Sequence, residues 1–165
     1  MEFVLRPMTA ADWPGVRAVY LEGIATGNAT FETEAPAWER WDAGHSAACR
    51  MVAQGAAGDV VGFAALSPAS ARKVYSGVAE VSVYVSQKAR GAGVGGALLR
   101  ELVRASEAAG FWTLQASIFP ENRASLRLTE KCGFRVLGIR ERVACMNGRW
   151  RDTVLMERRS AIAGV

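Results

Sequence analysis

A glycine-rich segment, Arg90-Gly91-Ala92-Gly93-Val94-Gly95-Gly96, most strongly constrains the fold of this chain. It follows the alternating apolar run Val81–Val85 and precedes an amphipathic helical pattern that starts at Ala97. Glycine lets the backbone adopt positive φ angles and approach a ligand closely. The first N–H groups of a helix lack acceptors and lie at the positive end of its dipole. With the added charge of Arg90, the segment predicts a binding site for a phosphate or pyrophosphate.

Two other glycine motifs share part of this spacing. Gly91, Gly93 and Gly96 fit the dinucleotide-binding fingerprint, but that motif requires an acidic residue at the end of the next strand. The next apolar run, residues 112–119, contains none. Gly91 and Gly96 also have the P-loop spacing, yet Ala and Leu stand where a P-loop needs Lys and Ser or Thr, so a P-loop is excluded. A glycine-rich turn without a ligand is the simpler alternative, although several glycines in one turn cost stability.

Composition indicates an ordinary globular protein. With 165 residues, of which 22% are charged, the chain is predicted to form one domain over residues 1–165. The net charge of +4 suits anionic ligands, but the positive charges are scattered, so no nucleic-acid partner is predicted. The sequence shows no signal peptide and no apolar run long enough to cross a membrane. We therefore expect a cytoplasmic protein without a membrane partner.

The cysteines and the single histidine predict no metal site. Cys49, Cys132 and Cys145 are odd in number and lack the spacing of metal ligands, so we expect reduced packing residues. His45 follows Trp41 in a mixed polar and apolar stretch, and we expect it on a helix surface rather than in catalysis. Five tryptophans in a small domain are consistent with an aromatic-rich interface between subunits.

The order of the periodic segments predicts an α/β fold with a mixed, mostly antiparallel sheet. A helix from the glycine segment to Gly110 joins the strands at residues 79–85 and 112–119, so a right-handed crossover makes these two strands parallel. Asn147-Gly148 predicts a hairpin turn between the last two strands. The other strands are expected at residues 3–6, 51–54, 60–66, 135–146 and 150–158, and the other helices after Thr9, after Pro36 and at residues 123–131.

Four segments, with the glycine loop, resemble the GNAT acetyltransferase superfamily over nearly the whole chain. Two of them, Glu80–Ser86 and Asn122–Leu128 with Glu130–Phe134, are shared by many GNAT enzymes. The other two, Ala29–Glu32 and Gly148–Asp152, are similar to the phosphinothricin and methionine sulfoximine N-acetyltransferases. The resemblance implies a GNAT fold in which the parallel strand pair splays apart and helices flank the sheet.

The resemblance also implies acetyl-CoA as co-substrate, lying in the gap between the splayed strands. The backbone of Val83, Tyr84 and Val85 is then expected to pair with the pantetheine arm, as a further strand would. Asn122 and Ser125 are expected near the thioester. The pyrophosphate is expected on the loop and helix start formed by Arg90, Gly91, Gly93, Val94, Gly95 and Gly96.

Acetyl transfer to an amine requires a base, because an amino group is mostly protonated at neutral pH. Glu80 is the candidate, since an acidic residue in an apolar strand is costly unless it has a function, and it matches the base proposed for the family. A strand-end glutamate in solvent or paired with Arg72 is the alternative. A backbone N–H near Val83 or Tyr84 could stabilise the oxyanion.

Thr129 departs from the family pattern, in which a tyrosine or histidine stands at this position. A threonine hydroxyl titrates too high to protonate the departing thiolate efficiently. Tyr75, Tyr84 or a water molecule could take that role, and the sequence does not rank them.

For the acceptor, Arg72 and Lys73 could bind a carboxylate. Phe31 and Glu32 are expected to form one wall, with Tyr75 nearby. These residues suit a small amino acid analogue such as phosphinothricin, methionine sulfoximine or methionine sulfone. The resemblance further implies a homodimer, in which Trp150 of a neighbouring subunit could close the site. Two alternatives stay open: an acetyltransferase for another amine (a peptide N-terminus, a polyamine or an aminoglycoside), and an acyl-CoA-binding module without catalysis.

Overall fold

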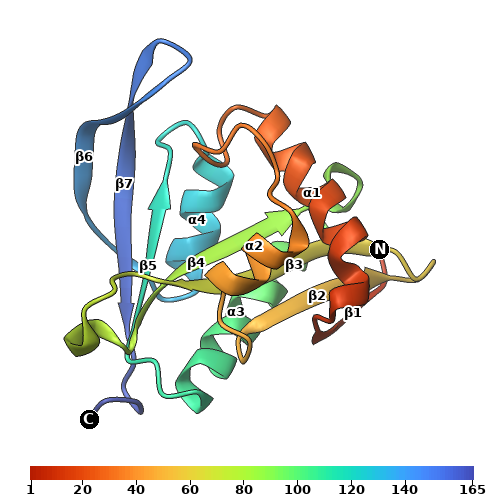
Figure 1. The fold of residues 1–165 in the computed structure, drawn as a ribbon, viewed down its shortest axis with the longest axis horizontal. Coiled ribbons are helices and arrows are strands. Elements are labelled where there is room, and N and C mark those ends of the chain that lie inside the picture. Colours follow the sequence, from red (N-terminus) through yellow and green to blue (C-terminus); the bar gives the residue numbers. More distant parts are fainter.

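The computed structural model describes residues 1–165 and shows seven strands with four α-helices (Figure 1). Every predicted strand and helix is present, with ends that differ by at most a few residues. In chain order the elements are β1 (Phe3–Pro7), α1 (Trp13–Ala25), α2 (Trp38–Gly44), β2 (Arg50–Gly55), β3 (Val60–Pro68), β4 (Val78–Val85), α3 (Val94–Ala108), β5 (Thr113–Ile118), α4 (Arg123–Lys131), β6 (Arg135–Met146) and β7 (Arg149–Arg159).

The strands form one sheet in the order β1-β2-β3-β4-β5-β7-β6. All neighbouring strands are antiparallel except β4 and β5, which confirms the mixed sheet and its single parallel pair. That pair is short: it ends where Glu80 lies opposite Gln115. β4 nevertheless stays paired with β3 as far as Val85 and Gly62. Beyond Glu80, the β5 side of β4 therefore has no strand partner, and the sheet splays at its centre.

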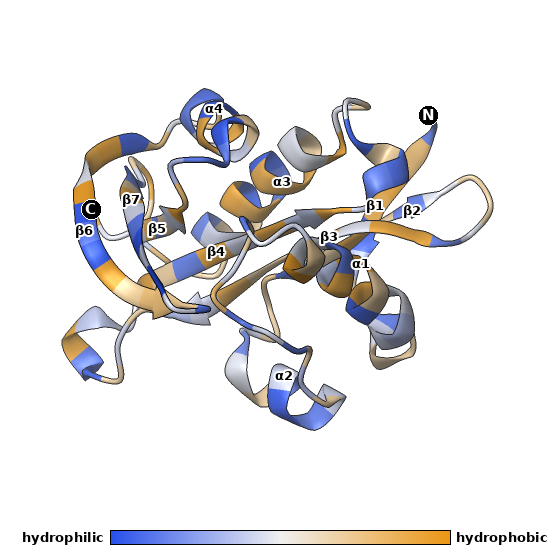
Figure 2. Ribbon diagram, turned by 90° about the horizontal axis from the view of Figure 1, so that it is seen from above, coloured by the Kyte–Doolittle hydropathy of each residue, from blue (hydrophilic) through white to orange (hydrophobic).

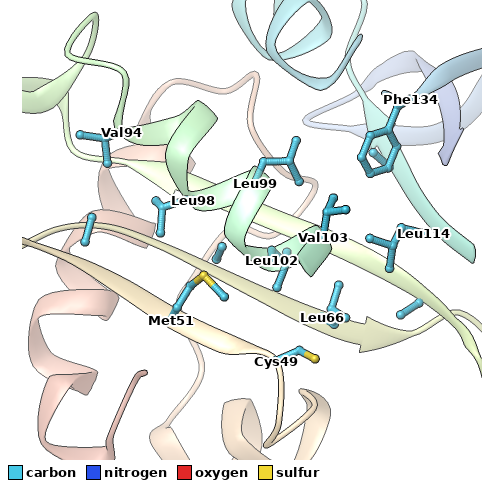
Figure 3. Packing of buried hydrophobic residues seen from close by; sticks show 14 of the residues in the cluster. Cys49, Met51, Leu66, Val94, Leu98, Leu99, Leu102, Val103, Leu114 and Phe134 are labelled. Carbon is cyan, nitrogen blue, oxygen red and sulfur yellow. The ribbon is translucent and has the colours of Figure 1, made fainter. Parts of the chain in front are cut away.

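The two faces of the sheet carry separate hydrophobic clusters. Figure 2 shows α3 and α4 on one side of the sheet and α1 and α2 on the other. Leu98, Leu99 and Leu102 of α3 pack over Leu66 and Leu114 (Figure 3). On the opposite face, a second cluster is formed by Trp13, Val16, Val19, Tyr20, Trp41, Val52 and Phe63. Because side chains alternate along a strand, Val81, Val83 and Val85 face α3, whereas Glu80, Ser82 and Tyr84 face α1 and α2.

Some expectations about single residues were wrong. Cys49 is buried and Cys132 half-buried, but Cys145 is exposed, because it lies on the β6–β7 hairpin that projects beyond the rest of the sheet (Figure 1). Trp13 and Trp41 belong to the core and not to a surface that could form an interface. By contrast, the helix start expected after Thr9 is confirmed: Thr9 is the N-cap of a 3₁₀ turn at Ala10–Asp12, and α1 follows directly at Trp13.

The start of this first helical segment is fixed by Asp12. Its carboxylate accepts hydrogen bonds from both terminal nitrogens of the Arg6 guanidinium, at 2.8 and 2.7 Å, and from the N–H of Thr9 at 2.8 Å. The Arg6 guanidinium is the main cause that lowers the pKa of Asp12 to about 2. A carboxyl pKa that is lower in the folded state stabilises the protein above the unfolded pKa of about 3.9. This stabilisation is lost as the pH falls from about 4 to about 2.

We therefore expect Asp12→Asn to lower the free energy of unfolding at pH 7 by roughly 1–3 kcal/mol. The difference from the wild type should shrink steadily below about pH 4, where the wild-type carboxyl also becomes protonated. Urea denaturation at several pH values measures it. Asp59→Asn is the matched control: Asp59 forms an exposed ion pair with Lys88, and surface pairs contribute little. A deficit in Asp12→Asn that is the same at pH 7 and pH 3 would contradict this account.

Candidate functional site

A cavity of about 1000 Å³ lies where the sheet splays. Both faces of β4 contribute to it, because Glu80 through Val85 all line its wall. The opposite wall comes from the end of β5, the first turns of α4 and Thr153 of β7. The segment between α1 and α2 covers one end, with Asn28, Phe31 and Glu32 among the lining residues. The cavity thus joins the two faces of the sheet, and Glu80 stands at the apex of the splay.

The glycine loop forms one end of this cavity. Gly91 and Gly93 have φ angles of +77° and +83°, as the sequence predicted for such a turn. Gly93 is the N-cap of α3, and its carbonyl accepts the first helical hydrogen bond, from Ala97 at 3.1 Å. The N–H groups of Val94, Gly95 and Gly96, which come before Ala97 in the first helical turn, therefore have no intrahelical acceptor. All the predicted loop residues line the cavity: Arg90, Gly91, Gly93, Val94, Gly95 and Gly96.

This end of the cavity fits a pyrophosphate. It offers free N–H groups, the positive end of a 15-residue helix and the guanidinium of Arg90. A Cβ at Gly95 would lie 2.7 Å from Leu128 Cδ1, so a larger residue there would require the Leu128 side chain to move. Next to the loop, the backbone groups of Val83 and Val85 that point away from β3 have no strand partner. An extended chain with amide groups could pair with them.

Glu80 is half-buried at the apex of the splay. Burial raises the pKa of its carboxyl, while a hydrogen bond from the Gln115 side chain and the charge of Arg140 oppose that rise. A carboxylate whose pKa is raised towards neutrality is a better proton acceptor than one in water. Glu80 is not paired with Arg72, so the alternative of a structural ion pair with that residue was wrong.

The aromatic residues on the same face are mostly structural. The Tyr84 ring stacks on Phe63 with a centroid distance of 5.1 Å and meets Tyr20 edge-on at 5.0 Å. Burial raises the pKa of Tyr84, so it keeps its proton. His45 is half-buried and not a free surface residue: it stacks on Trp41 at 4.1 Å, and its Nδ1 lies 2.7 Å from the Trp41 carbonyl oxygen. Burial lowers the pKa of His45, which favours the neutral ring.

The predicted acceptor residues fall into two groups. Phe31 and Glu32 line the cavity, and the Phe31 ring meets Phe119 edge-on at 4.7 Å. By contrast, the exposed loop between β3 and β4 carries the other three, Arg72, Lys73 and Tyr75. None of these three lines the cavity, and the Arg72 guanidinium lies over the Tyr75 ring at 6.0 Å. Trp150 does not line it either and is 63% exposed.

The start of α4 forms the wall opposite β4. Asn122 is the N-cap: its Oδ1 accepts a hydrogen bond from the Ser125 N–H at 3.2 Å. Its Nδ2 donates to the carbonyl of Asn28 at 3.2 Å. Asn122 thus ties α4 to the segment after α1, while Asn122 and Ser125 both line the cavity as predicted. Thr129, one helical turn further along α4, is 4% exposed and lines it as well.

Two residues of β7 that sequence reasoning did not assign to the site belong to its surroundings. The Arg151 guanidinium donates to the Gly27 carbonyl at 3.0 Å and to Asn28 Oδ1 at 2.8 Å. It also lies 4.0 Å over the Phe119 ring. Thr153 is buried, lines the cavity, and its hydroxyl has no hydrogen-bond partner. Arg151 falls within a segment that resembles the family, whereas the only sequence signal for Thr153 was its place in an alternating strand.

Residues 11–134 match the sequence profile of the Acetyltransferase (GNAT) family. The chain belongs to this family. The L-methionine sulfoximine/L-methionine sulfone acetyltransferase of Pseudomonas paraeruginosa is 31% identical over 95% of this chain and 94% of the relative. The crystal structure of a GNAT phosphinothricin acetyltransferase from Sinorhizobium meliloti in complex with AcCoA has a TM-score of 0.89, with 32% identity over 99% of this chain and 91% of that one.

A second solved structure matches almost as well. The ribosomal-protein-alanine N-acetyltransferase from Brucella melitensis has a TM-score of 0.86 and 30% identity, over 95% of this chain and 99% of that one. The predicted family and the GNAT fold are confirmed, and the chain is an acetyltransferase for which acetyl-CoA is the donor. No helix of this GNAT domain is both long and apolar enough to span a bilayer.

Proposed function

We propose that this chain transfers the acetyl group of acetyl-CoA to the α-amino group of a small amino acid analogue. Phosphinothricin, L-methionine sulfoximine and methionine sulfone are the acceptors that we expect. The observation that carries the proposal is the position of Glu80, which lies at the apex of the splayed strands in the same cavity as the glycine loop. The relatives named for these three compounds support the choice of acceptor.

The donor is proposed to run through the splay. Its pyrophosphate would lie on the N–H groups from Gly91 to Gly96, beside Arg90. Its pantetheine arm would pair with the backbone from Val83 to Val85. This direction brings the thioester towards Glu80 and the start of α4, where Asn122 and Ser125 line the wall.

In the proposed reaction, Glu80 takes a proton from the acceptor ammonium, directly or through water. The free amine then attacks the thioester carbonyl, and the CoA thiolate leaves. The structure narrows the choice of proton donor for that thiolate. Tyr75 lies outside the cavity, and Tyr84 is four residues beyond Glu80, roughly 13 Å along the strand. We therefore assign the role to water, oriented by the Thr129 hydroxyl.

The acceptor is proposed to lie between Glu80 and the Phe31–Glu32 segment. Arg72, Lys73 and Tyr75 stay a prediction as acceptor ligands, supported only by their place on the loop that leads into β4. A homodimer also stays a proposal. It is supported by the apolar side chains that the β6–β7 hairpin exposes, namely Val136, Leu137, Ile139 and Trp150.

Thiol release from acetyl-CoA in the presence of a panel of amines tests the function. We expect turnover with phosphinothricin, methionine sulfoximine and methionine sulfone, and far slower turnover with ordinary amino acids, a polyamine or an aminoglycoside. A peptide with an N-terminal alanine belongs in the panel because a relative of 30% identity is an N-acetyltransferase for ribosomal-protein alanine. Turnover confined to that peptide would replace the proposed acceptor. Binding of acetyl-CoA without turnover on any amine would favour a non-catalytic module.

A further inference from the structure

The segment between α1 and α2 forms a wall of the cavity without regular structure of its own. No backbone–backbone hydrogen bond involves residues 28–34 of this segment. Asn28, Phe31 and Glu32 nevertheless line the cavity. Because no ladder or helix fixes their backbone, the position of these residues depends on side-chain contacts. The side chains that make those contacts therefore set the shape of this wall.

Arg151 of β7 makes two of these contacts. Val154 lies opposite Ile118, the last residue of β5, so Arg151 lies beyond the end of that strand. Its guanidinium donates to the carbonyl of Gly27 at 3.0 Å and to Asn28 Oδ1 at 2.8 Å. A planar guanidinium holds two acceptors in fixed relative positions, which the ammonium of a flexible lysine does less well. Arg151 therefore fixes the chain where it enters the segment.

A second link from Arg151 to the segment runs through aromatic rings. The Arg151 guanidinium lies 4.0 Å over the ring of Phe119, which is itself buried. The Phe31 ring meets Phe119 edge-on at a centroid distance of 4.7 Å. Cation–π and edge-on aromatic contacts of this kind are favourable in desolvated surroundings. One side chain thus holds both the start of the segment and the ring on which Phe31 packs.

The stability of β7 does not by itself explain an arginine at this position. The Arg151 side chain is 9% exposed, and the carboxylate that it meets, Glu121, lies 3.4 Å away on a side chain that is 53% exposed. A buried charge without a close ion pair costs stability, and apolar residues of similar size often replace such charges without loss. Arg151 also does not line the cavity. It therefore acts through the segment that it holds and not by touching a ligand.

We propose that Arg151 is a positioning residue for the acceptor. By holding the start of the segment and the Phe119 ring, it keeps Phe31 in the wall against which the acceptor binds. The proposal rests on the function proposed above, in which the acceptor lies between Glu80 and the Phe31–Glu32 segment. The glycine loop forms a different end of the cavity. Loss of Arg151 should therefore weaken use of the acceptor and leave the binding of acetyl-CoA unchanged.

The first test compares acceptor kinetics with donor binding. Arg151→Met keeps a long apolar side chain over Phe119 but removes the charge and both hydrogen bonds. We expect kcat/KM for methionine sulfone to fall roughly 10- to 100-fold, because a small displacement of a positioning wall has an effect of this size. The Kd of acetyl-CoA, measured by calorimetry, should be unchanged. In a Phe31→Ala background the same substitution should have little further effect, since residues that act through one another are not additive.

The second test measures release of the segment without any acceptor. Chymotrypsin cleaves after Phe31 only when that ring leaves its packing site, so the cleavage rate of the native protein reports local opening. We expect Arg151→Met to raise this rate roughly 10-fold or more, as for the loss of hydrogen bonds to a charged group. Asn28→Ala, which removes one of the two acceptors, should raise it less. Arg158→Met is the matched control: Arg158 is also on β7 but donates to Glu107 at 2.8 Å, outside the cavity, and both readouts should stay at the wild-type value.

The outcomes separate this inference from the proposed function. Wild-type turnover of methionine sulfone with unchanged cleavage and unchanged kcat/KM in Arg151→Met overturns the positioning role alone. Equal losses of kcat/KM with and without Phe31 also overturn it, because a general structural effect would act in both backgrounds. If Arg151→Met fails to fold, Asn28→Ala decides between the same outcomes. Absence of wild-type turnover overturns the proposed function and the acceptor role of Arg151 with it.

Discussion

Glu80→Gln is expected to lower kcat roughly 10²- to 10⁴-fold while the affinity for acetyl-CoA is largely kept. This is the usual contribution of a positioned general base. Glutamine has nearly the same shape as glutamate and can still contact Gln115, but it cannot take the proton from the acceptor ammonium. Single-turnover kinetics, with acetyl-CoA binding measured separately by calorimetry, distinguish the two effects. A rate that stays within a few fold of the wild type would remove Glu80 from the mechanism.

The pH dependence of kcat/KM is a second test of Glu80 as the base. Burial raises the pKa of Glu80, and only the ionised carboxylate can act as base. Therefore kcat/KM should rise with pH through that pKa, and this low-pH limb should be absent in Glu80→Gln. Glu32→Gln is the matched control, because Glu32 lines the same cavity away from the apex and its loss should leave the limb in place.

The stability of the same variant should change in the opposite direction to its activity. A carboxyl whose pKa is raised in the folded state loses stability as the pH rises above the unfolded value of about 4.3. Ionised Glu80 is thus a cost to the fold at neutral pH, which the neutral glutamine removes. We expect Glu80→Gln to be at least as stable as the wild type at pH 7 in urea denaturation. Active sites often show this trade between activity and stability.

Much of the fold could be predicted from local patterns in the sequence. Alternation along residues 79–85 and the helical period after Gly96 predicted the strand, the turn and α3. The long crossover to residues 112–119 predicted the one parallel pair, because only a crossover connection can join parallel neighbours. The splay itself could not be derived in this way. It depends on pairing that stops after Glu80 and Gln115, and that pairing is set by contacts between distant segments. It was expected only because the chain resembles the family.

The candidate site could be predicted only where its residues form a local pattern in the sequence. Glycines and an arginine before a helix carry their chemistry locally, so the loop was found. The sequence could not predict that Arg72 and Lys73 lie outside the cavity, because no local pattern shows which way an exposed loop turns. Thr153 had no signal beyond its place in an alternating strand. Its position in the cavity wall depends on the register of β7 with β5, which is a property of the assembled sheet.

We expect the glycine loop to affect the affinity for acetyl-CoA only through its contacts with the pyrophosphate of that donor. Arg90 is exposed and forms no salt bridge within the chain, so its charge is free for a ligand. Arg90→Ala is expected to lower kcat/KM for acetyl-CoA roughly 10- to 100-fold, the usual contribution of a hydrogen bond to a charged group. S-acetylpantetheine, which carries the same thioester without the pyrophosphate, should be affected far less. The ratio of kcat/KM for the two donors therefore measures the loop directly.

Gly93→Ala tests the backbone of the loop separately from its charge. A Cβ at Gly93 would meet no atom within 4 Å, so the substitution causes no clash. The φ of +83° is nevertheless unfavourable for alanine by roughly 1–2 kcal/mol. Relief of that strain would turn the N–H groups at the start of α3 away from the pyrophosphate, and the donor ratio should fall as in Arg90→Ala. Lys88→Ala is the matched control, because Lys88 precedes the loop but pairs with Asp59 outside the cavity. If both loop variants weakened the two donors equally, the loop would be a structural turn and the pyrophosphate would bind elsewhere.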